Sequence, residues 1–296
     1  LACSAVQAQE RGIEEVSVAG RQLNLIGSAT PASQRQISQQ ELDLRPLLRV
    51  GEALETVPGL VATQKSGSGN ANQLFLRGFN LDHGTDFATW LDAMPVNMRS
   101  HGHGQGYTDL NFIIPETIAQ LTYKKGSYYA DIGDFSGAGS AAIQTLNRVD
   151  HGSALLTAGA DSYYRLLLMD DLASASGDTL FALEATRYHG PWRDIDEQLD
   201  KTNLLIKHTL TLDDGFFSAA LMTYDNSWNS ADQIPQRAVQ QGIVDELGSL
   251  DTDLGGNSSR YSVNAQWRQG RWQGSGYWLR YTLNLWSNFT YYLDNP

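Results

Sequence analysis

Three of the six histidines lie in one glycine-rich part of the first half of the sequence. His101 and His103 stand one residue apart within residues 99–109, and His83 precedes this segment. Imidazole nitrogens bind Zn, Cu, Ni or Fe, and two histidines separated by one residue point to the same face of an extended chain. This spacing predicts one of three roles: a transition-metal site formed by His83, His101 and His103, hydrogen bonding to another solute, or a structural loop.

Other polar side chains accompany these histidines and extend the candidate binding site. They supply carboxylate, guanidinium, amide and phenol groups, which are hydrogen-bond donors and acceptors for a solute. No cluster of cysteine or methionine supports a soft-metal site. The candidates for contact with an extracellular ligand are Asp82, His83, Arg99, His101, His103, Gln105 and Tyr107.

The charge balance excludes one large class of ligand. The chain has 21 Lys and Arg against 33 Asp and Glu, a formal charge of -12. A protein that binds nucleic acid needs a positive surface to displace counterions from phosphates, so no nucleic-acid partner is expected. Low charge content with abundant Gly, Tyr and Trp favours a β-rich secreted or outer-membrane protein. No apolar run is long enough for a transmembrane helix.

The N-terminus resembles a processed export signal. Val6 and Ala8 are small residues at the positions that signal peptidase reads, which predicts residues 1–8 to be a signal-peptide remnant and Gln9 the mature N-terminus. The alternatives are a lipoprotein acylated at Cys3 and a start without any signal. Because Cys3 is the only cysteine, the mature chain would carry no thiol in the oxidising periplasm.

Residues up to about Arg148 predict a compact α/β unit. Ser38 and Glu41 have the spacing of a capping box, and Pro46 is expected to open a second helix that Pro58-Gly59 ends. Glycine-rich turns are expected at residues 66–70 and 136–140, and neither has the strand-to-helix context of a phosphate-binding loop. Short strands are predicted at residues 60–64, 73–77, 88–91, 118–124 and 141–146.

The second half alternates between apolar and polar residues, as strands with one apolar face do. Transmembrane barrel strands of about ten residues have this pattern and turn the apolar face to lipid, whereas a soluble all-β domain is the alternative. In the last segment the apolar face consists of Tyr277, Leu279, Tyr281, Leu283 and Leu285. Seven antiparallel strands are predicted, at residues 152–162, 163–173, 178–189, 201–212, 215–227, 258–269 and 271–290.

The connections between these strands are short at one end and mostly long at the other, as at the periplasmic and extracellular rims of outer-membrane barrels. The long loop at residues 228–257 is rich in Asp and Glu. It would attract cations, including those that bridge lipopolysaccharide, or be simply a solvated loop. Seven strands leave unpaired edges in lipid, so the barrel is expected to be incomplete and the chain a fragment.

Four segments of the first half resemble the plug domain of TonB-dependent outer-membrane receptors. They are residues 51–61, 76–79, 90–96 and 118–143, in the family's order and at roughly its spacing. The fourth departs from the family pattern, because Gly126-Ser127 stands where Gly-Pro is usual. The plug-motif residues that carry the resemblance are Pro58, Gly59, Arg77, Gly78, Phe79 and Asp92.

The resemblance implies an α+β plug domain at residues 20–148 and a partial transmembrane β-barrel at residues 149–296. It also implies a TonB box in residues 9–19, an extended segment that adds a strand to the sheet edge of TonB. An ordinary first strand of the plug is the alternative. Arg77 is expected to pair with a barrel carboxylate, with Glu184 as the candidate. The residues that resemble the box are Glu14, Glu15, Val16, Ser17 and Val18.

The implied function is active uptake of a scarce solute across the bacterial outer membrane. A ferric siderophore or another metal complex is expected as cargo, and a receptor for free Zn or Cu ions is the alternative within the family. The expected partners are TonB with its inner-membrane energising complex, the extracellular ligand, and outer-membrane lipid and lipopolysaccharide. No catalysis is expected, and no cofactor beyond a transported metal ion or chelate. A secreted enzyme or adhesin is the alternative of another class, although no nucleophile elbow and no internal repeat supports it.

Overall fold

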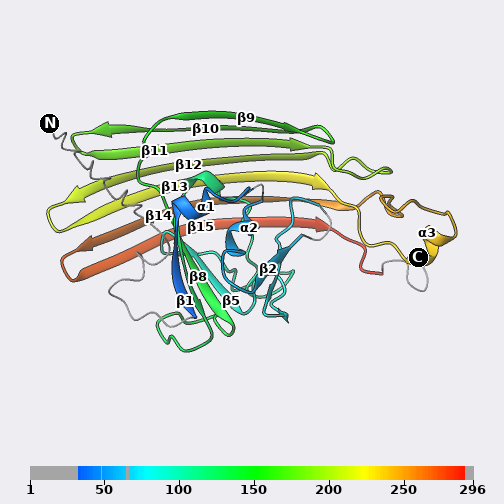
Figure 1. Cartoon of the computed structure of the whole chain (residues 1–296), viewed down its shortest axis with the longest axis horizontal. Coiled ribbons are helices and arrows are strands. Elements are labelled where there is room, and N and C mark those ends of the chain that lie inside the picture. Colours follow the sequence, from blue (N-terminus) through cyan, green and yellow to red (C-terminus); the bar gives the residue numbers. More distant parts are fainter. Residues whose placement is uncertain (1–32, 48, 65–66, 291–296) are drawn as a thin grey trace, which may run out of the picture.

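The computed structural model describes residues 33–47, 49–64 and 67–290. These residues form two parts, which Figure 1 shows packed face to face. Residues 33–148 are called the N-terminal unit here. The long strands that follow form one antiparallel sheet, called the wall.

The larger sheet of the N-terminal unit has five strands in the order β1-β7-β8-β5-β6. β5 and β8 run parallel, whereas the other neighbours are antiparallel. This arrangement brings segments distant in sequence next to each other, so that the ends of β5 and β8 meet at the wall. The strands are β1 Gln34–Ser38, β5 Phe87–Leu91, β6 Met94–Pro95, β7 Ile118–Lys125 and β8 Gly139–Thr145.

A smaller sheet contains β2 Leu60–Thr63, β3 Gln73–Leu76 and β4 Phe79–Asn80. Two residues, Arg77 and Gly78, join β3 to β4, and both have positive φ, 54° and 80°. Two-residue hairpins of this kind match the right-handed twist of the flanking strands. The Arg-Gly pair of the sequence motif is therefore first of all a turn.

The helices of the N-terminal unit are short: α1 Gln39–Leu42, α2 Gly51–Leu54 and the 3-10 turn η2 Pro115–Thr117. Ser38 precedes α1 as predicted, but its side chain makes no capping bond, and Glu41 instead pairs with Arg35 at 2.6 Å. The prediction that Pro46 opens the second helix is wrong. A helix of four residues is held by tertiary packing rather than by propensity, and Ala53 and Leu54 are fully buried.

The wall has seven strands in sequential order, and each predicted strand is confirmed to within a few residues. The tight turns after β10, β12 and β14 lie at one end, and the loops at residues 189–198 and 230–254 lie at the other, the second containing α3 Gln236–Gln240. The short β9–β10 turn at residues 160–162 shares the end of the long loops. No helix among the described residues is long and apolar enough to cross a membrane. The wall strands are β9 Ser153–Gly159, β10 Tyr163–Ser174, β11 Gly177–Tyr188, β12 Leu199–Leu212, β13 Gly215–Asn229, β14 Gly255–Gln269 and β15 Trp272–Trp286.

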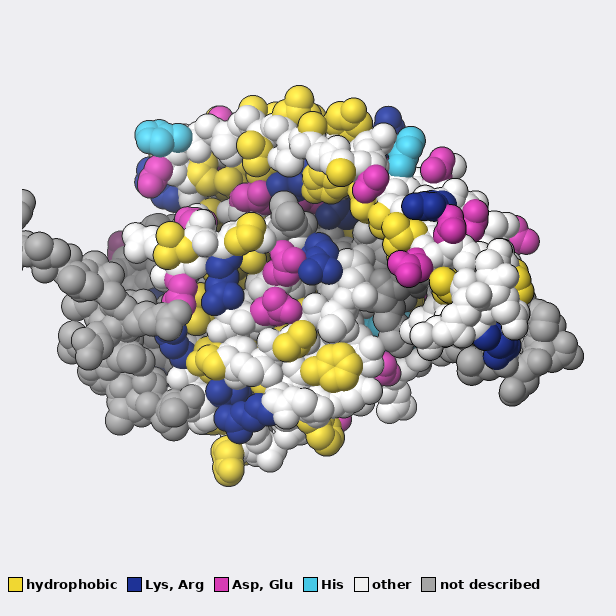
Figure 2. Space-filling model, turned by 45° about the vertical axis from the view of Figure 1, so that its right-hand side comes forward, with side chains coloured by type: hydrophobic (Ala, Val, Ile, Leu, Met, Phe, Trp, Pro, Cys, Tyr) yellow, Lys and Arg dark blue, Asp and Glu magenta, His cyan; other side chains and the backbone are white. Residues whose placement is uncertain are grey.

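The two faces of the wall differ as the alternation predicted for most strands. Ile206, Leu221 and Val263 are more than a third exposed on the outer face, whereas Leu205 and Met222 are almost fully buried against the N-terminal unit. Hydrophobic side chains gather at the top of the molecule in Figure 2, where β9 and β10 run in Figure 1. The outer face therefore offers an apolar surface to its surroundings.

β15 is the exception, and the expectation that its apolar face turns outward is wrong. Leu285 pairs with Gly256 and shares the inner face, and the hydroxyl of Tyr281 donates to Asp109 of the N-terminal unit. The outer row instead contains Arg280, Thr282 and Asn284. The apolar row points inward because it packs beside the histidine-bearing loop.

One apolar core joins the two parts of the molecule. Buried side chains from both sheets and both helices of the N-terminal unit, such as Leu54 and Ile143, belong to the same cluster as Leu167, Leu180 and Met222 of the wall. The N-terminal unit therefore rests on the wall through a shared hydrophobic contact, and polar groups then fix its position.

Candidate functional site

Asp92 lies in a tight turn at the point where the N-terminal unit meets the wall. The turn joins β5 to β6, with φ of 46° at Asp92 and 63° at Ala93. Asp92 is 1% exposed, and its carboxylate accepts hydrogen bonds from Thr145 N at 3.0 Å and Thr145 Oγ1 at 2.5 Å. The carboxylate thereby ties the turn to the end of β8.

Side chains on the inner face of the wall hold this turn. Lys207 Nζ lies 3.5 Å from Asp92 Oδ1 and donates to the carbonyl oxygen of Thr145 at 3.0 Å. Asn264 Nδ2 donates to the carbonyl oxygen of Asp92 at 3.0 Å, and Arg260 Nη2 donates to that of Pro95 at 3.4 Å. A buried charge needs a partner of opposite sign and further hydrogen bonds. Asp92 and Lys207 are ionic partners of each other, and Thr145 forms hydrogen bonds with both.

A second polar contact lies around Arg165 on β10. Its guanidinium makes a bidentate pair with Glu116, both distances 2.7 Å, and also donates to Glu184 Oε2 at 2.5 Å. Lys201 Nζ lies 2.6 Å from the other oxygen of Glu184, which is 1% exposed. Two acids and two bases are thus neutralised together, and Glu116 is the member from the N-terminal unit. We call this network and the Asp92–Lys207 contact the seat.

The predicted partnership of Arg77 with Glu184 is wrong. Glu184 lies on the inner face of β11, as its place in the alternation indicated, but Arg165 and Lys201 occupy both of its oxygens. Arg77 is exposed in the β3–β4 turn and makes no ion pair with any residue that the structure describes. Its backbone N–H donates to the carbonyl oxygen of Gly59 at 2.7 Å, so two of the sequence motifs meet through the backbone.

The histidine-bearing loop is closed by Asn97, a residue that the sequence did not single out. Its Oδ1 accepts from Thr89 N at 2.6 Å, and its Nδ2 donates to the carbonyl oxygens of Gly84 at 2.9 Å and Gly106 at 3.1 Å. Backbone bonds between Met98 and Tyr107 complete the loop base. A buried amide that bonds three backbone segments holds the loop in one conformation.

Four of the predicted ligand residues come together above this base, next to one tyrosine of the wall. We call this group the apical cluster: His83, His101, His103, Tyr107 and Tyr281. The His101 ring stacks on Tyr107 with centroids 4.2 Å apart and planes at 2°, and the His83 and His103 rings meet edge to face at 4.6 Å. Ring contacts of this geometry add stabilisation beyond the area that they bury.

Hydrogen bonds connect the apical cluster to both parts of the molecule. The Tyr107 hydroxyl donates to Asn70 Oδ1 at 2.7 Å and accepts from Ala71 N at 3.2 Å. The Tyr281 hydroxyl donates to Asp109 Oδ2 at 3.0 Å. Burial raises the pKa of the Asp109 carboxyl, and the neighbouring hydrogen bonds only partly oppose this.

A cavity of about 730 Å³ opens above the apical cluster, between the histidine-bearing loop and the inner face of β15. Its lining contains no Lys or Arg, and Asp82 is its only acid. Arg99 and Gln105 are exposed and do not line it, which leaves these two predicted ligand residues apart from the others. The lining residues are Asp82, His83, Met98, Ser100, His101, Gly102, His103, Tyr281, Thr282, Leu283, Leu285 and Phe289.

The imidazoles of the apical cluster are used in internal contacts rather than gathered around one point. His83 Nδ1 donates to the carbonyl oxygen of Ala71 at 3.0 Å, and His101 Nδ1 accepts from His103 N at 3.1 Å. The described part of the chain contains no group of three or more His, Cys, Asp or Glu side chains that could hold a metal ion. Burial lowers the pKa of His101, and His103 lowers it further, so the neutral ring is favoured.

The glycine-rich segment at residues 67–70 meets the wall beside the apical cluster. A Cβ atom at Gly69 would lie 2.0 Å from the Trp228 ring, and one at Gly67 would lie 2.7 Å from it, so only glycine fits under this indole. Ser68 N donates to Glu197 Oε1 at 2.5 Å. Burial raises the pKa of Glu197, in the loop between β11 and β12. The predicted glycine-rich turn is thus the part of the plug on which the Trp228 ring of the wall packs.

Several residues of this site were missed from the sequence, although one signal could have found some of them. Arg165, Lys201 and Lys207 are charged residues on the inward row of alternating strands, where a charge implies a partner. Glu116, Asn97 and Asp109 have no comparable signal because they lie in turns and short segments. The predicted TonB box, Glu14, Glu15, Val16, Ser17 and Val18, and the signal-peptide remnant lie outside the described residues.

Comparisons with known proteins identify the N-terminal unit and the arrangement of the wall. Residues 27–140 match the family model of the TonB-dependent Receptor Plug Domain. The unliganded ferric citrate transporter FecA is 14% identical with a TM-score of 0.70, over 90% of this chain and 42% of that one. The siderophore receptor PiuA from Acinetobacter baumannii is 16% identical with a TM-score of 0.64, over 86% of this chain and 37% of that one.

The copper transporter OprC also has this arrangement, at 16% identity and a TM-score of 0.62, over 85% of this chain and 37% of that one. At sequence identities this low, the comparison shows a similar fold and no more. The chain spans about two-fifths of the length of these solved structures. A plug domain followed by antiparallel wall strands is therefore the fold that the sequence predicted.

Proposed function

We propose that this chain, whose residues 27–140 match the family model of the TonB-dependent receptor plug domain, belongs to an outer-membrane receptor that imports a metal chelate with energy supplied through TonB. The observation that supports this proposal best is the cavity above the apical cluster. It lies between a loop of the plug and the inner face of the wall, at the end of the wall that carries the long loops. A ligand there would touch the plug and the wall at once.

The lining favours one class of chelate over another. Aromatic, imidazole and aliphatic side chains surround the cavity, and no Lys or Arg among the lining residues would compensate a strongly anionic ligand. A neutral or weakly charged complex with aromatic or apolar surface fits this lining, because desolvating an uncompensated charge is costly. Free metal ions are less well suited, since the three histidines are engaged with one another and with the backbone.

The contacts around the cavity provide a route from ligand binding to plug movement. A ligand that contacts His101 would shift the rings of Tyr107 and Tyr281. Tyr107 is hydrogen-bonded to Asn70 and Ala71 of the plug, and Tyr281 is hydrogen-bonded to Asp109. The seat keeps the plug against the wall until force is applied. In this proposal residues 14–18 offer a strand to TonB, whose pull separates the contacts of the seat and opens a path.

The test is uptake of iron and of copper by cells that carry the protein as its gene encodes it, with and without TonB. The probes are a neutral ferric chelate with aromatic ligand groups and ferric citrate, both labelled with ⁵⁵Fe, and free Cu²⁺, whose uptake is measured as cellular copper. We expect TonB-dependent accumulation of the neutral chelate, and an H101A/H103A variant should bind it less tightly. R99A/Q105A is the matched control, because both side chains lie outside the cavity lining.

Accumulation of none of the probes would contradict the transport proposal. Uptake of free Cu²⁺ alone, lost in H101A/H103A, would replace the chelate by the metal ion. Equal loss of binding in R99A/Q105A would show that the cavity is not the binding site.

A further inference from the structure

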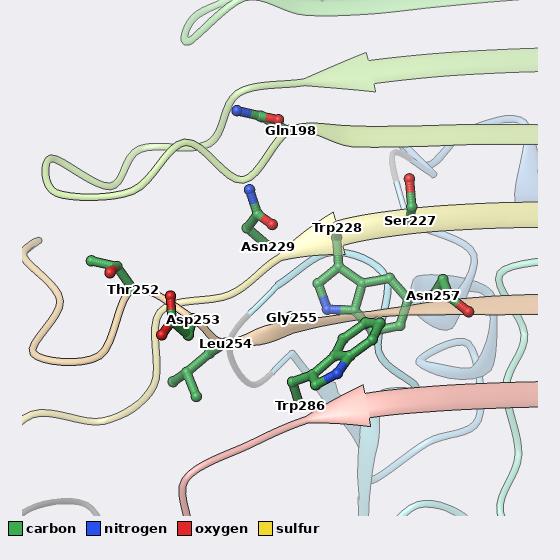
Figure 3. A pocket seen from close by; sticks show the side chains of 11 residues that line it. Gln198, Ser227, Trp228, Asn229, Thr252, Asp253, Leu254, Gly255, Asn257 and Trp286 are labelled. Atoms are coloured by element: carbon green, nitrogen blue, oxygen red, sulfur yellow. The ribbon is translucent and has the colours of Figure 1, made fainter.

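A second cavity lies on the outer face of the wall, away from the apical cluster. It has a volume of about 470 Å³ and is formed where the ends of β13, β14 and β15 meet the loops before β12 and β14 (Figure 3). Nothing in the proposed transport route uses it. Its lining residues are Gln198, Ser227, Trp228, Asn229, Thr252, Asp253, Leu254, Gly255, Gly256, Asn257 and Trp286.

Trp286 provides a flat apolar side to this cavity. It pairs with Gly255 across β14 and β15, on the face that also carries Asn257, and its side chain is 52% exposed. Gly255 cannot be replaced by a larger residue, because a Cβ atom there would lie 2.4 Å from the carbonyl oxygen of Trp228. The missing side chain at Gly255 leaves the space beside the Trp286 indole open.

Glycine is also required at position 256, because this residue faces the Trp228 ring on the inner face of the wall. A Cβ atom at Gly256 would lie 2.7 Å from the ring of Trp228, which packs beneath β14 and is almost fully buried. The two glycines of β14 therefore leave room for a tryptophan on each face: the buried Trp228 of β13 on one and the exposed Trp286 of β15 on the other. Figure 3 shows these two tryptophans at the ends of the strands that flank β14.

The remaining lining is polar but nearly uncharged. Asn257 Oδ1 accepts from Asn284 Nδ2 at 2.9 Å, and Asn229 Nδ2 donates to the carbonyl oxygen of Asp196 at 2.9 Å, so both amides are held in place. The side chains of Gln198, Ser227 and Thr252 make no hydrogen bond to any other residue that the structure describes, and Asp253 is the only charged lining group. Donors and acceptors are thus left for a ligand.

The position of this cavity along the strands limits what can reach it. Outward apolar and aromatic side chains on β14 run from Trp267 to Tyr261, and Asn257 lies four residues further toward the long loops. At 3.3 Å per residue this is about 13 Å along the strand beyond the last outward aromatic residue. Barrel strands tilt by about 35–45° and their apolar band is about 25 Å tall, so in an outer-membrane receptor this level lies at the outer boundary of the band, next to the sugars of lipopolysaccharide.

We propose that the cavity at Trp286 binds a neutral saccharide unit. The C–H face of a pyranose ring packs on an exposed indole, while the hydroxyls at the ring edge take hydrogen bonds from amide and hydroxyl side chains of the kind that line this cavity. A phosphorylated sugar is disfavoured because Asp253 is present and no Lys or Arg lines the space. The hexoses of the lipopolysaccharide core fit these requirements, and so does a free glycan.

The test measures binding to the protein as its gene encodes it, purified in detergent, by calorimetry. The probes are core oligosaccharide freed of its acyl chains and maltoheptaose, a soluble neutral glucan. We expect the core oligosaccharide to bind, and the W286A variant to bind at least about tenfold more weakly, because truncating an aromatic anchor removes most of the contact. The W286F variant should retain much of the affinity, since a flat ring remains.

Trp272 at the other end of β15 provides the matched control, because it is also outward and exposed, at 64%, but lies far from the cavity. W272A should bind like the unaltered protein. Binding of maltoheptaose alone, lost in W286A, would support the saccharide site and assign it to free glycans. Binding of neither probe, or equal binding by W286A and the unaltered protein, would overturn the proposal. This outcome is independent of transport, since iron uptake is measured separately.

Discussion

The seat and the apical cluster both join the plug to the wall, yet they consist of different kinds of side chain. The seat consists of full charges, each buried or half-buried and matched by an opposite charge, with Asp92 and Glu116 from the plug and the other members from the wall. The apical cluster consists of neutral rings, stacked on one another beside an open cavity. The difference indicates that the seat fixes the position of the plug, whereas the apical cluster can rearrange around a ligand without exposing an unpaired charge.

The largest effect should follow from breaking the seat at Arg165. In R165M, Glu116 loses its bidentate partner, and Glu184 keeps Lys201 as ionic partner and a hydrogen bond from Asn203. Removing one member of a buried ionic network costs about 3–5 kcal/mol, and we expect the free energy of unfolding to fall by that amount. Denaturation of the full-length protein in detergent, followed by tryptophan fluorescence, measures the change.

Arg187 provides the control for this comparison. It pairs with Asp200 at 3.3 Å, but both side chains are mostly exposed. R187M should therefore change the free energy of unfolding by less than about 0.5 kcal/mol. Equal losses in R165M and R187M would show that burial of the seat contributes nothing.

A smaller effect is expected at the other half of the seat. Asp92 retains both bonds from Thr145 when Lys207 is removed, so K207M should be less harmful than R165M. Comparison of D92N, K207M and the double variant should give a coupling energy of about 1–3 kcal/mol, as for residues in one network. Strict additivity would mean that Asp92 and Lys207 act independently.

The apical cluster should respond to a hydroxyl deletion with a still smaller loss. Y107F keeps the ring that stacks on His101 but removes the bonds to Asn70 and Ala71. We expect the free energy of unfolding to fall by about 1–2 kcal/mol, the cost of leaving buried polar groups unpaired. Ligand affinity should stay close to that of the unaltered protein, and a large loss of affinity would assign the hydroxyl to the ligand.

The smallest effect is a pH dependence confined to the apical cluster. Burial lowers the pKa of His101 below its ordinary value of 6.5, so the folded chain binds fewer protons than the unfolded chain. Its contribution to stability is therefore complete above pH 6.5 and is lost as the pH falls through the lowered pKa. Ligand affinity should decrease as the pH falls below 6.5, and H101F should flatten this profile. An unchanged slope in H101F would point to another titrating group.

The sequence predicted the architecture well because its signals are local. Alternation located the wall strands, and the motif around Asp92 located the turn that the wall holds. The partner of Arg77 was predicted wrongly because pairing depends on register across strands, which alternation does not specify. The inward apolar row of β15 was misjudged for a related reason: alternation identifies two faces but not which one meets the plug.

The site was predicted in part. The histidine spacing in a glycine-rich part of the sequence indicated that His83, His101 and His103 lie close together, and the structure places these rings together. The sequence could not indicate that Arg99 and Gln105 lie outside the cavity lining, because the direction of each loop side chain depends on the local backbone turn. Tyr281 belongs to another segment entirely, and only the packing of β15 on the plug brings it to the cluster.

Four of the wall's contacts with the plug end on carbonyl oxygens: Asn203 donates to Asn111 O, Lys207 to Thr145 O, Arg260 to Pro95 O and Asn264 to Asp92 O. Every amino acid carries this acceptor, so a substitution at position 95 or 111 leaves the bond available as long as the backbone keeps its course. The plug can therefore accumulate changes at these positions without matching changes in the wall. Such an interface lets two parts of one chain evolve at different rates while they continue to fit.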